Sequence, residues 1–84
     1  MNEHYIEHND FVIMMFSLRY AANRLSYAPG LVCDYIIKHI PQMSKKQQEQ
    51  MQIEVNDIIK HQMYADNIAL SELLRLLSAL EEAQ

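Results

Sequence analysis

Hydrophobic residues recur along this chain at spacings of three and four, which is the pattern of amphipathic helices. Between residues 11 and 25 the spacing alternates regularly, as it does on one buried side of a helix. The expected stripe consists of Phe11, Met15, Leu18, Ala22 and Leu25. Asn9 or Asp10 is expected to cap this helix, because short polar side chains accept hydrogen bonds from its free N–H groups. The first predicted helix spans about residues 11–25.

A second helix is predicted over about residues 29–40. Pro29 suits a first helical turn, where the N–H that proline lacks would have no partner, and Ser26 is a candidate cap. Pro41 ends the helix, since the residue before a proline is driven out of helical geometry. Its apolar side is expected to comprise Leu31, Val32, Tyr35, Ile36 and Ile40.

A third helix is predicted over about residues 45–63, starting at a capping box. Ser44 is followed three residues later by Gln47, so the two side chains can each satisfy a backbone N–H group of the other residue. The expected buried stripe is Met51, Val55, Ile58, Ile59 and Met63.

The apolar register fails between Lys60 and Asn67, where two interpretations stay open. Asp66 or Asn67 can cap a fourth helix over about residues 67–82. Alternatively, one long bent helix runs from Ser44 to about Glu82, because no Pro or Gly intervenes. We favour the break.

These elements predict an all-α fold, a small bundle of three to four helices in a single domain over residues 1–84. Residues 11–16 are apolar on every side of their helix, and five leucines fall within residues 73–80. Helices of this kind are covered on several sides, and a short chain buries its surface less completely than a long one. We therefore expect a homodimer or another protein partner to complete the bundle. The candidate core or dimer residues are Phe11, Val12, Met15, Leu73 and Leu77.

Composition narrows the functional classes. The 84 residues carry 7 basic and 11 acidic side chains, a net charge of −4, which opposes non-specific binding to nucleic acids. The single cysteine, Cys33, indicates a reducing compartment. The start of the chain is polar, and the longest apolar run, residues 11–16, is too short for a bilayer. A cytoplasmic protein that does not enter a membrane is expected.

No set of residues predicts an enzyme, a cofactor or a metal site. His4 and His8 are spaced like neighbours on a helix, but solvent exposure near a chain end is the more common situation. Cys33 lies among apolar residues and is expected to be buried rather than nucleophilic. A glycine-rich phosphate loop is excluded, because Gly30 is the only glycine.

Arginines and tyrosines gather where the first predicted helix ends, and they are the candidate partner-binding residues. They are Arg19, Tyr20, Asn23, Arg24 and Tyr27. In the interpretation ranked first they are structural: the tyrosines close the first helix on the second, and Arg24 pairs with Asp34 or a helix end. A protein interface ranks second, since Tyr and Arg are enriched at binding hot spots. Nucleic-acid binding with help from Lys38 ranks third.

About a quarter of the chain, residues 16–36, carries a wider pattern. Arg19, Tyr20, Ala21, Arg24 and Tyr27 match the motif Leu-Arg-Tyr-Ala-Leu-Gly-Arg-x-Thr-Tyr, while Ala22-Asn23 replaces Leu-Gly and Ser26 replaces Thr. In this run the chain resembles small helical proteins encoded by bacteriophages and prophages. The resemblance implies a phage or mobile-element origin and, by analogy, an inhibitor or modulator that binds a host complex such as a CRISPR effector. The alternatives are a nucleic-acid-binding accessory protein and a structural assembly subunit.

Overall fold

The computed structural model describes residues 5–84, which form four α-helices and one short 3₁₀ helix. The helices are α1 (His8–Ala22), α2 (Ala28–His39), α3 (Lys45–Lys60) and α4 (Asn67–Ala83), and the 3₁₀ helix η1 (Ile40–Gln42) follows α2. The predicted all-α fold is confirmed. The break between the third and fourth helices is confirmed as well, because the loop of residues 61–66 separates α3 from α4.

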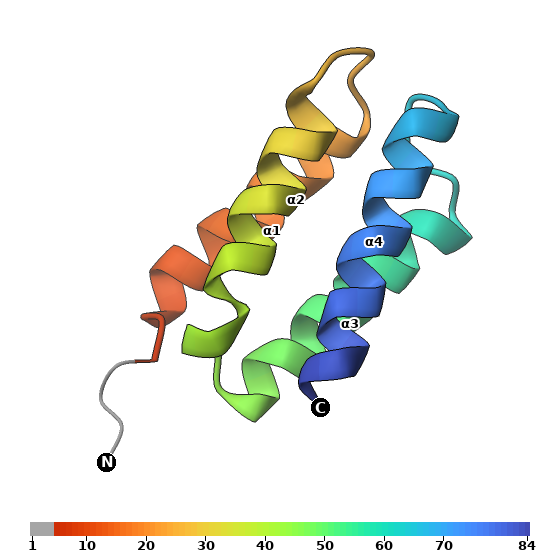
Figure 1. The fold of residues 1–84 in the computed structure, drawn as a ribbon. Helices are drawn as coiled ribbons and strands as arrows, with labels where there is room; N and C mark the ends of the chain where they lie inside the picture. Colours follow the sequence, from red (N-terminus) through yellow and green to blue (C-terminus); the bar gives the residue numbers. More distant parts are fainter. Residues whose placement is uncertain (1–4) are drawn as a thin grey trace.

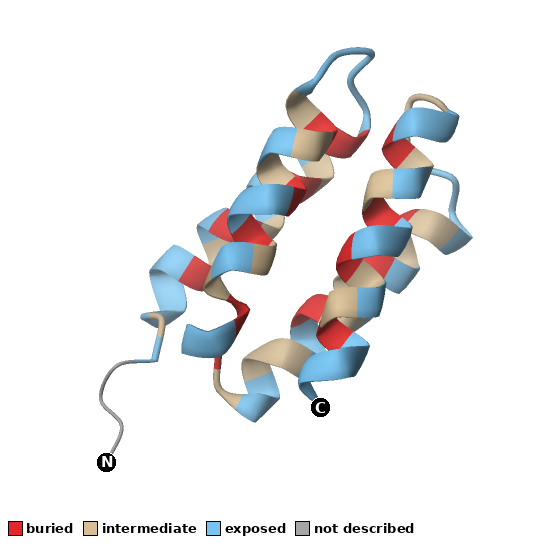
Figure 2. Ribbon diagram, in the orientation of Figure 1, coloured by how far each residue is buried: buried red, intermediate tan, exposed pale blue. Residues whose placement is uncertain are grey.

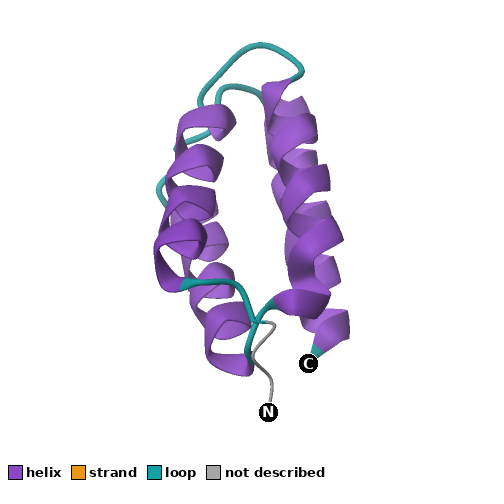
Figure 3. Cartoon of the chain, turned by 90° about the vertical axis from the view of Figure 1, so that its left-hand side faces the viewer, coloured by secondary structure: helices purple, strands orange, loops and turns teal. Residues whose placement is uncertain are grey.

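Two helical hairpins make up the bundle (Figure 1). The hairpin of α1 and α2 packs on the hairpin of α3 and α4, with α2 against α4 and α1 against α3. The view turned by 90° shows the loops gathered at the two ends of the bundle (Figure 3). Each helix therefore packs mainly against two neighbouring helices and has an outer side that faces away from them.

The first helix differs from its predicted bounds at both ends. It starts at His8, so Asn9 and Asp10 lie inside the first turn, and Glu7 is an N-cap without a side-chain hydrogen bond. Asp10 still suits this place, because a carboxylate near a helix N-terminus is stabilised by the helix dipole. The helix ends at Ala22, and the N–H of Arg24 turns back to donate to the carbonyl of Ala21 (3.0 Å). Leu25 is thus outside the helix and 77% exposed, so its predicted place in the buried stripe is wrong.

The other helix starts follow the sequence signals closely. Ser44 and Gln47 form the predicted capping box, with Gln47 N–H donating to Ser44 Oγ (3.1 Å) and Ser44 N–H donating to Gln47 Oε1 (3.0 Å). Asp66 caps α4 by accepting a hydrogen bond from Ala69 N–H (2.9 Å). Ser26 Oγ accepts from Ala28 N–H (3.1 Å) in front of α2, although Tyr27 holds the N-cap position.

The α3 helix ends in a Schellman motif that contains no glycine. Met63 N–H donates to the Ile58 carbonyl (2.9 Å) and Gln62 N–H to the Ile59 carbonyl (3.1 Å), which is the paired 6→1 and 5→2 pattern. Gln62, the first residue after the C-cap His61, has φ = 54°. This left-handed conformation costs a side-chain-bearing residue free energy that glycine does not lose.

Replacing Gln62 by glycine is therefore expected to stabilise the protein. Relief of the left-handed strain exceeds the backbone entropy that glycine loses on folding, so we expect a gain of about 0.5–1 kcal/mol. Chemical denaturation measured by circular dichroism would give the difference. Gln62→Ala is the matched control and should not gain stability; a glycine variant no more stable than the alanine variant would contradict the strain.

The core lies between the two hairpins and runs the length of the bundle (Figure 2). Its largest fully buried side chains come from all four helices: Phe11 and Leu18; Ile36; Met51, Val55 and Ile58; and Leu73, Leu76 and Leu80. Cys33 is buried among them, as predicted. Leu31 and Tyr35, predicted for the buried side of the second helix, are instead 60% and 53% exposed, because α2 turns Pro29, Cys33 and Ile36 inward.

One chain closes this core by itself. It exposes 5394 Å², close to the roughly 5200 Å² expected for a folded monomer of 9.9 kDa. Phe11 and Leu73 are fully inside, and Val12, Met15 and Leu77 are half-buried. These five residues thus belong to the fold of the single chain. Burying these five residues does not require a second chain, and the homodimer stays a prediction.

Candidate protein-interaction surface

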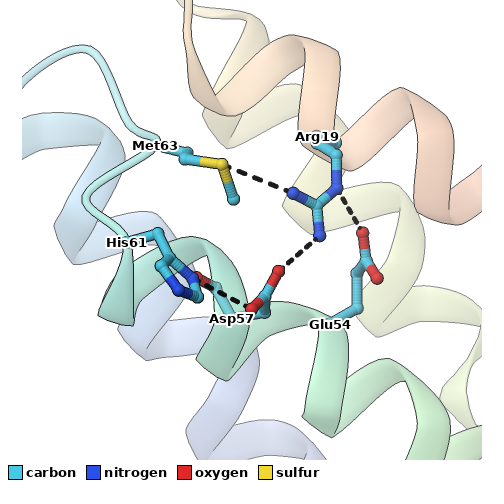
Figure 4. Close-up of polar contacts among 5 residues, drawn as sticks. All are labelled: Arg19, Glu54, Asp57, His61 and Met63. Atoms are coloured by element: carbon cyan, nitrogen blue, oxygen red, sulfur yellow. Dashed lines mark hydrogen bonds and ion pairs between the residues drawn. The ribbon is translucent and has the colours of Figure 1, made fainter.

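The predicted Arg/Tyr cluster divides into one inward and four outward side chains. Arg19 turns toward α3 and lies between two acidic side chains of that helix (Figure 4). Its Nε donates to Glu54 Oε2 (2.6 Å) and its Nη2 to Asp57 Oδ2 (3.0 Å). A third donor, Nη1, lies 3.5 Å from Met63 Sδ. Every nitrogen of the guanidinium group therefore has a partner within the fold.

The electrostatics match this geometry. The hydrogen bonds that Arg19 donates to Glu54 and Asp57 raise the pKa of Arg19, and the bond to Asp57 lowers the pKa of that carboxyl. His61 adds to the lowering, since its ring nitrogen lies 3.0 Å from Asp57 Oδ1. Arg19 thus joins α1 to α3, which agrees with the structural interpretation of the cluster that was ranked first.

The other four side chains of the cluster are exposed. Tyr20 and Tyr27 are 65% and 82% exposed, so the prediction that tyrosines close the first helix on the second is wrong. The guanidinium of Arg24 lies over the Tyr20 ring, 4.0 Å from its centroid, in a cation–π contact. Asn23 lies in the exposed loop between α1 and α2.

Arg24 does not form the predicted pair with Asp34. Arg75 of α4 takes that carboxylate instead, with Nη2 donating to Asp34 Oδ1 (2.6 Å), and it also contacts Glu72 (2.6 Å). Within residues 5–84, Arg24 forms no ion pair. The charge of Arg24 is therefore free to meet an acidic group on another molecule.

A larger surface, which sequence reasoning missed, covers the outer side of the α1–α2 hairpin. Five large side chains, each more than half exposed, define what we call the α1–α2 face: Ile13, Phe16, Tyr20, Leu31 and Tyr35. Their exposed fractions run from 53% for Tyr35 to 68% for Phe16. A few exposed apolar residues are normal on any protein, but Ile13, Leu31 and Tyr35 line one groove between two adjacent helices, and such a grouping is typical of an interaction site.

The face is hollowed by a groove between the two helices. The groove has a volume of about 770 Å³, and Met14, Val32 and Ile36 contribute apolar wall beside the exposed Ile13 and Leu31. Its polar groups include two carboxylates, Glu7 and Asp10, at the N-terminal end of α1. The lining contains no lysine or arginine within the described chain.

One sequence signal did point to this surface. Residues 11–16 are apolar all round, and Ile13 and Phe16 are the members of that run that the bundle leaves exposed. The run shows that the outer side of the helix is apolar. Only the packing of α1 against α2 and α3 decides which residues of the run lie there.

The candidate metal-binding and nucleophilic residues of the sequence lie in separate parts of the chain. Within residues 5–84, no group of three His, Cys, Asp or Glu side chains converges on a common point. His8 starts α1 and is exposed, while His4 lies outside the described residues. Burial raises the pKa of the Cys33 thiol to about 12, and the thiolate is the form of cysteine that reacts.

Cys33 is therefore expected to resist thiol reagents in the folded protein. At neutral pH we expect the folded protein not to react with 5,5′-dithiobis(2-nitrobenzoic acid) in buffer. After unfolding in guanidinium chloride, each chain should release one equivalent of the coloured thionitrobenzoate. The absorbance of the released thionitrobenzoate measures the reaction of the folded protein and of the unfolded protein. Rapid reaction in buffer, under conditions where circular dichroism shows an intact fold, would contradict the burial.

The fold and this surface together define a small four-helix bundle with an exposed apolar face. Comparisons with known proteins add no relative: no family model, curated protein or solved structure matches the chain. Among the helices of the described residues, none combines the length and hydrophobicity required to cross a bilayer.

Proposed function

We propose that this protein acts by binding another protein chain through the α1–α2 face. The observation that supports the proposal is the group of five exposed large side chains on α1 and α2, of which Ile13, Leu31 and Tyr35 line an apolar groove. Covering such a surface removes apolar area from water, which is the main driving force of protein association. Three of the five residues are aromatic, and tyrosine and phenylalanine are enriched at interfaces.

The proposal includes a non-enzymatic role without a cofactor. It is supported by a thiol that burial keeps protonated and by the single-chain core, which leaves binding as the use for the exposed apolar side chains. A cytoplasmic location is part of the proposal, because an unpaired cysteine suits a reducing compartment.

The partner class follows from the resemblance of residues 16–36 to phage and prophage proteins. On that analogy the bound chain is a component of a host system, such as a CRISPR effector, or a second copy of this protein. The exposed Tyr20, Asn23, Arg24 and Tyr27 extend the face toward the α1–α2 loop. They supply the polar and aromatic rim that specific interfaces have.

Two variants test the proposal. Each replaces an exposed aliphatic residue by glutamate, but they do so on different surfaces of the bundle. Leu31→Glu puts a charge on the face, and Ile53→Glu puts one at a 69% exposed position of α3, outside it. Size-exclusion chromatography with light scattering reports self-association, and capture from a host lysate followed by mass spectrometry reports other partners.

We expect at least one association, with self or with a host protein, that Leu31→Glu abolishes and Ile53→Glu retains. A captured protein has to be purified and shown to bind the wild-type chain directly. If neither self-association nor direct host binding distinguishes the two variants, the proposal fails.

A further inference from the structure

We infer that the α1–α2 face binds a second copy of this chain, with the two α1 helices antiparallel across a two-fold axis near Phe16. The inference rests on the proposed function, because it takes the face as a protein-binding surface and names its occupant. The argument depends on the order of side chains along the outer side of α1.

The outer side of α1 has an acidic end and an apolar middle, and Arg24, in the loop that follows the helix, adds a positive charge at the other end. Ile13, Phe16 and Tyr20 are spaced by three and four residues, so they lie along one side of the helix. Asp10 precedes Ile13 by three residues, and Arg24 follows Tyr20 by four. Asp10 borders the groove, and Arg24 stacks on the Tyr20 ring at the opposite end of the helix.

Two copies of this surface are complementary when they pair antiparallel, because the acidic end of each copy then meets the basic end of the other. In a two-fold interface every contact occurs twice. If a residue of the first copy contacts a different residue of the second copy, the same two residues also meet with the copies exchanged. With the axis near Phe16, Ile13 of one copy lies beside Tyr20 of the other, and Asp10 lies beside Arg24. Each charge contact therefore occurs twice, at the two ends of an apolar centre. A parallel pairing would instead place like charges together, which is unfavourable.

Both charges are free to make these contacts. Within residues 5–84, neither Asp10 nor Arg24 forms an ion pair. Arg24 is held over Tyr20 by the cation–π contact and remains exposed. Its guanidinium is thus already placed at the rim of the face, where little side-chain entropy is lost on binding.

The size of the face also suits a dimer. A fully covered aromatic side chain buries about 150–250 Å², and the five residues of the face are 53–68% exposed. Together they offer on the order of 600 Å². The adjoining groove walls bring one copy close to the roughly 800 Å² that each partner contributes to a standard interface.

Analytical ultracentrifugation of charge variants tests the arrangement. We expect the wild-type chain to be dimeric at tens of micromolar, Phe16→Glu to be monomeric, and Ile53→Glu to remain dimeric. Asp10→Arg and Arg24→Asp should each weaken the dimer about tenfold, since each places like charges together twice. The double variant Asp10→Arg/Arg24→Asp should return to within about threefold of the wild-type affinity, because its charges are complementary again.

Circular dichroism has to show an intact fold in each variant, because a basic residue in the first turn of α1 opposes the helix dipole. A wild-type chain that is monomeric at these concentrations overturns the inference. So does a folded double variant that stays as weak as the single variants. If the chain is monomeric but binds a host protein in a manner that Leu31→Glu abolishes, this inference fails while the proposed function stands.

Discussion

Leu18→Ala is expected to destabilise the protein by about 2–5 kcal/mol, the range for removing a buried leucine side chain. Leu18 is completely buried and belongs to the core between the hairpins. Its truncation removes apolar contacts and leaves a cavity that the surrounding helices fill only partly. For a domain whose whole stability is about 5–15 kcal/mol, this is a large fraction. Urea or guanidinium titration followed by circular dichroism measures it.

Leu25→Ala is the matched control, since it makes the same chemical change seven residues further along. The sequence pattern places both leucines on one buried stripe, but Leu25 is 77% exposed. We expect its truncation to change the free energy of unfolding by less than about 0.5 kcal/mol. Equal destabilisation by the two variants would contradict the observed end of α1 at Ala22.

Arg19→Ala is expected to cost about 1–2 kcal/mol of stability, the second-largest effect. A hydrogen bond between charged groups contributes about 1.5–3 kcal/mol where it is shielded, and the 36% exposed Arg19 side chain calls for a lower figure because solvent screens it. The bond to Glu54 accounts for most of this effect, since its side chain is the less exposed of the two acidic partners. Thermal or chemical denaturation measures the loss.

Arg24→Ala provides the comparison. Within residues 5–84, the side chain of Arg24 stacks on the exposed Tyr20 ring and forms no ion pair. Its removal should leave stability within about 0.5 kcal/mol of the wild type. If Arg24→Ala destabilised the protein as much as Arg19→Ala, the division of the cluster into an inward and an outward part would be wrong.

Acid should weaken the contribution of the Arg19 cluster. The pKa of Asp57 is lowered below its ordinary value of 3.8, so the folded state binds this proton less readily than the unfolded chain. The stabilisation is fully present above pH 3.8 and is lost as the pH falls through the depressed pKa. Asp57→Asn should therefore be less stable than the wild type at pH 7, and the difference should shrink as the pH falls below 3.8. A difference that stays constant with pH would contradict the lowered pKa.

Local sequence signals predicted the helices well wherever a signal acts on its own backbone. The Ser44–Gln47 capping box, Asp66 as an N-cap and the proline near the start of α2 all lie where the sequence indicates. The two caps succeed because each is a contact between residues three positions apart, and the proline succeeds because the N–H that it lacks would have no partner in the first turn. The first helix was predicted less well, since Asn9 and Asp10 are each capable of capping it and the chain uses neither.

The candidate site was predicted only in part, because the relevant partners are distant in sequence. Arg19 meets Glu54 and Asp57, which are 35 and 38 residues away. No pattern within α1 indicates that it turns toward them and that Arg24, five residues later, does not. The exposed place of Leu31 and Tyr35 has the same origin, since it depends on which side of α2 packs against α4.

The sequence by itself determined an all-α protein of three to four helices with a buried cysteine, and it favoured a break before residue 67, because periodicity, caps and composition act locally. The tertiary structure alone decided that one chain closes its own core, that Arg19 joins α1 to α3, and that apolar side chains remain on the outside of the α1–α2 hairpin. The physical reason is that a helix with apolar residues on every side, such as α1 over residues 11–16, can pack into a core with more than one of its sides. Packing against the other helices, which depends on the whole chain at once, selects the side that stays exposed.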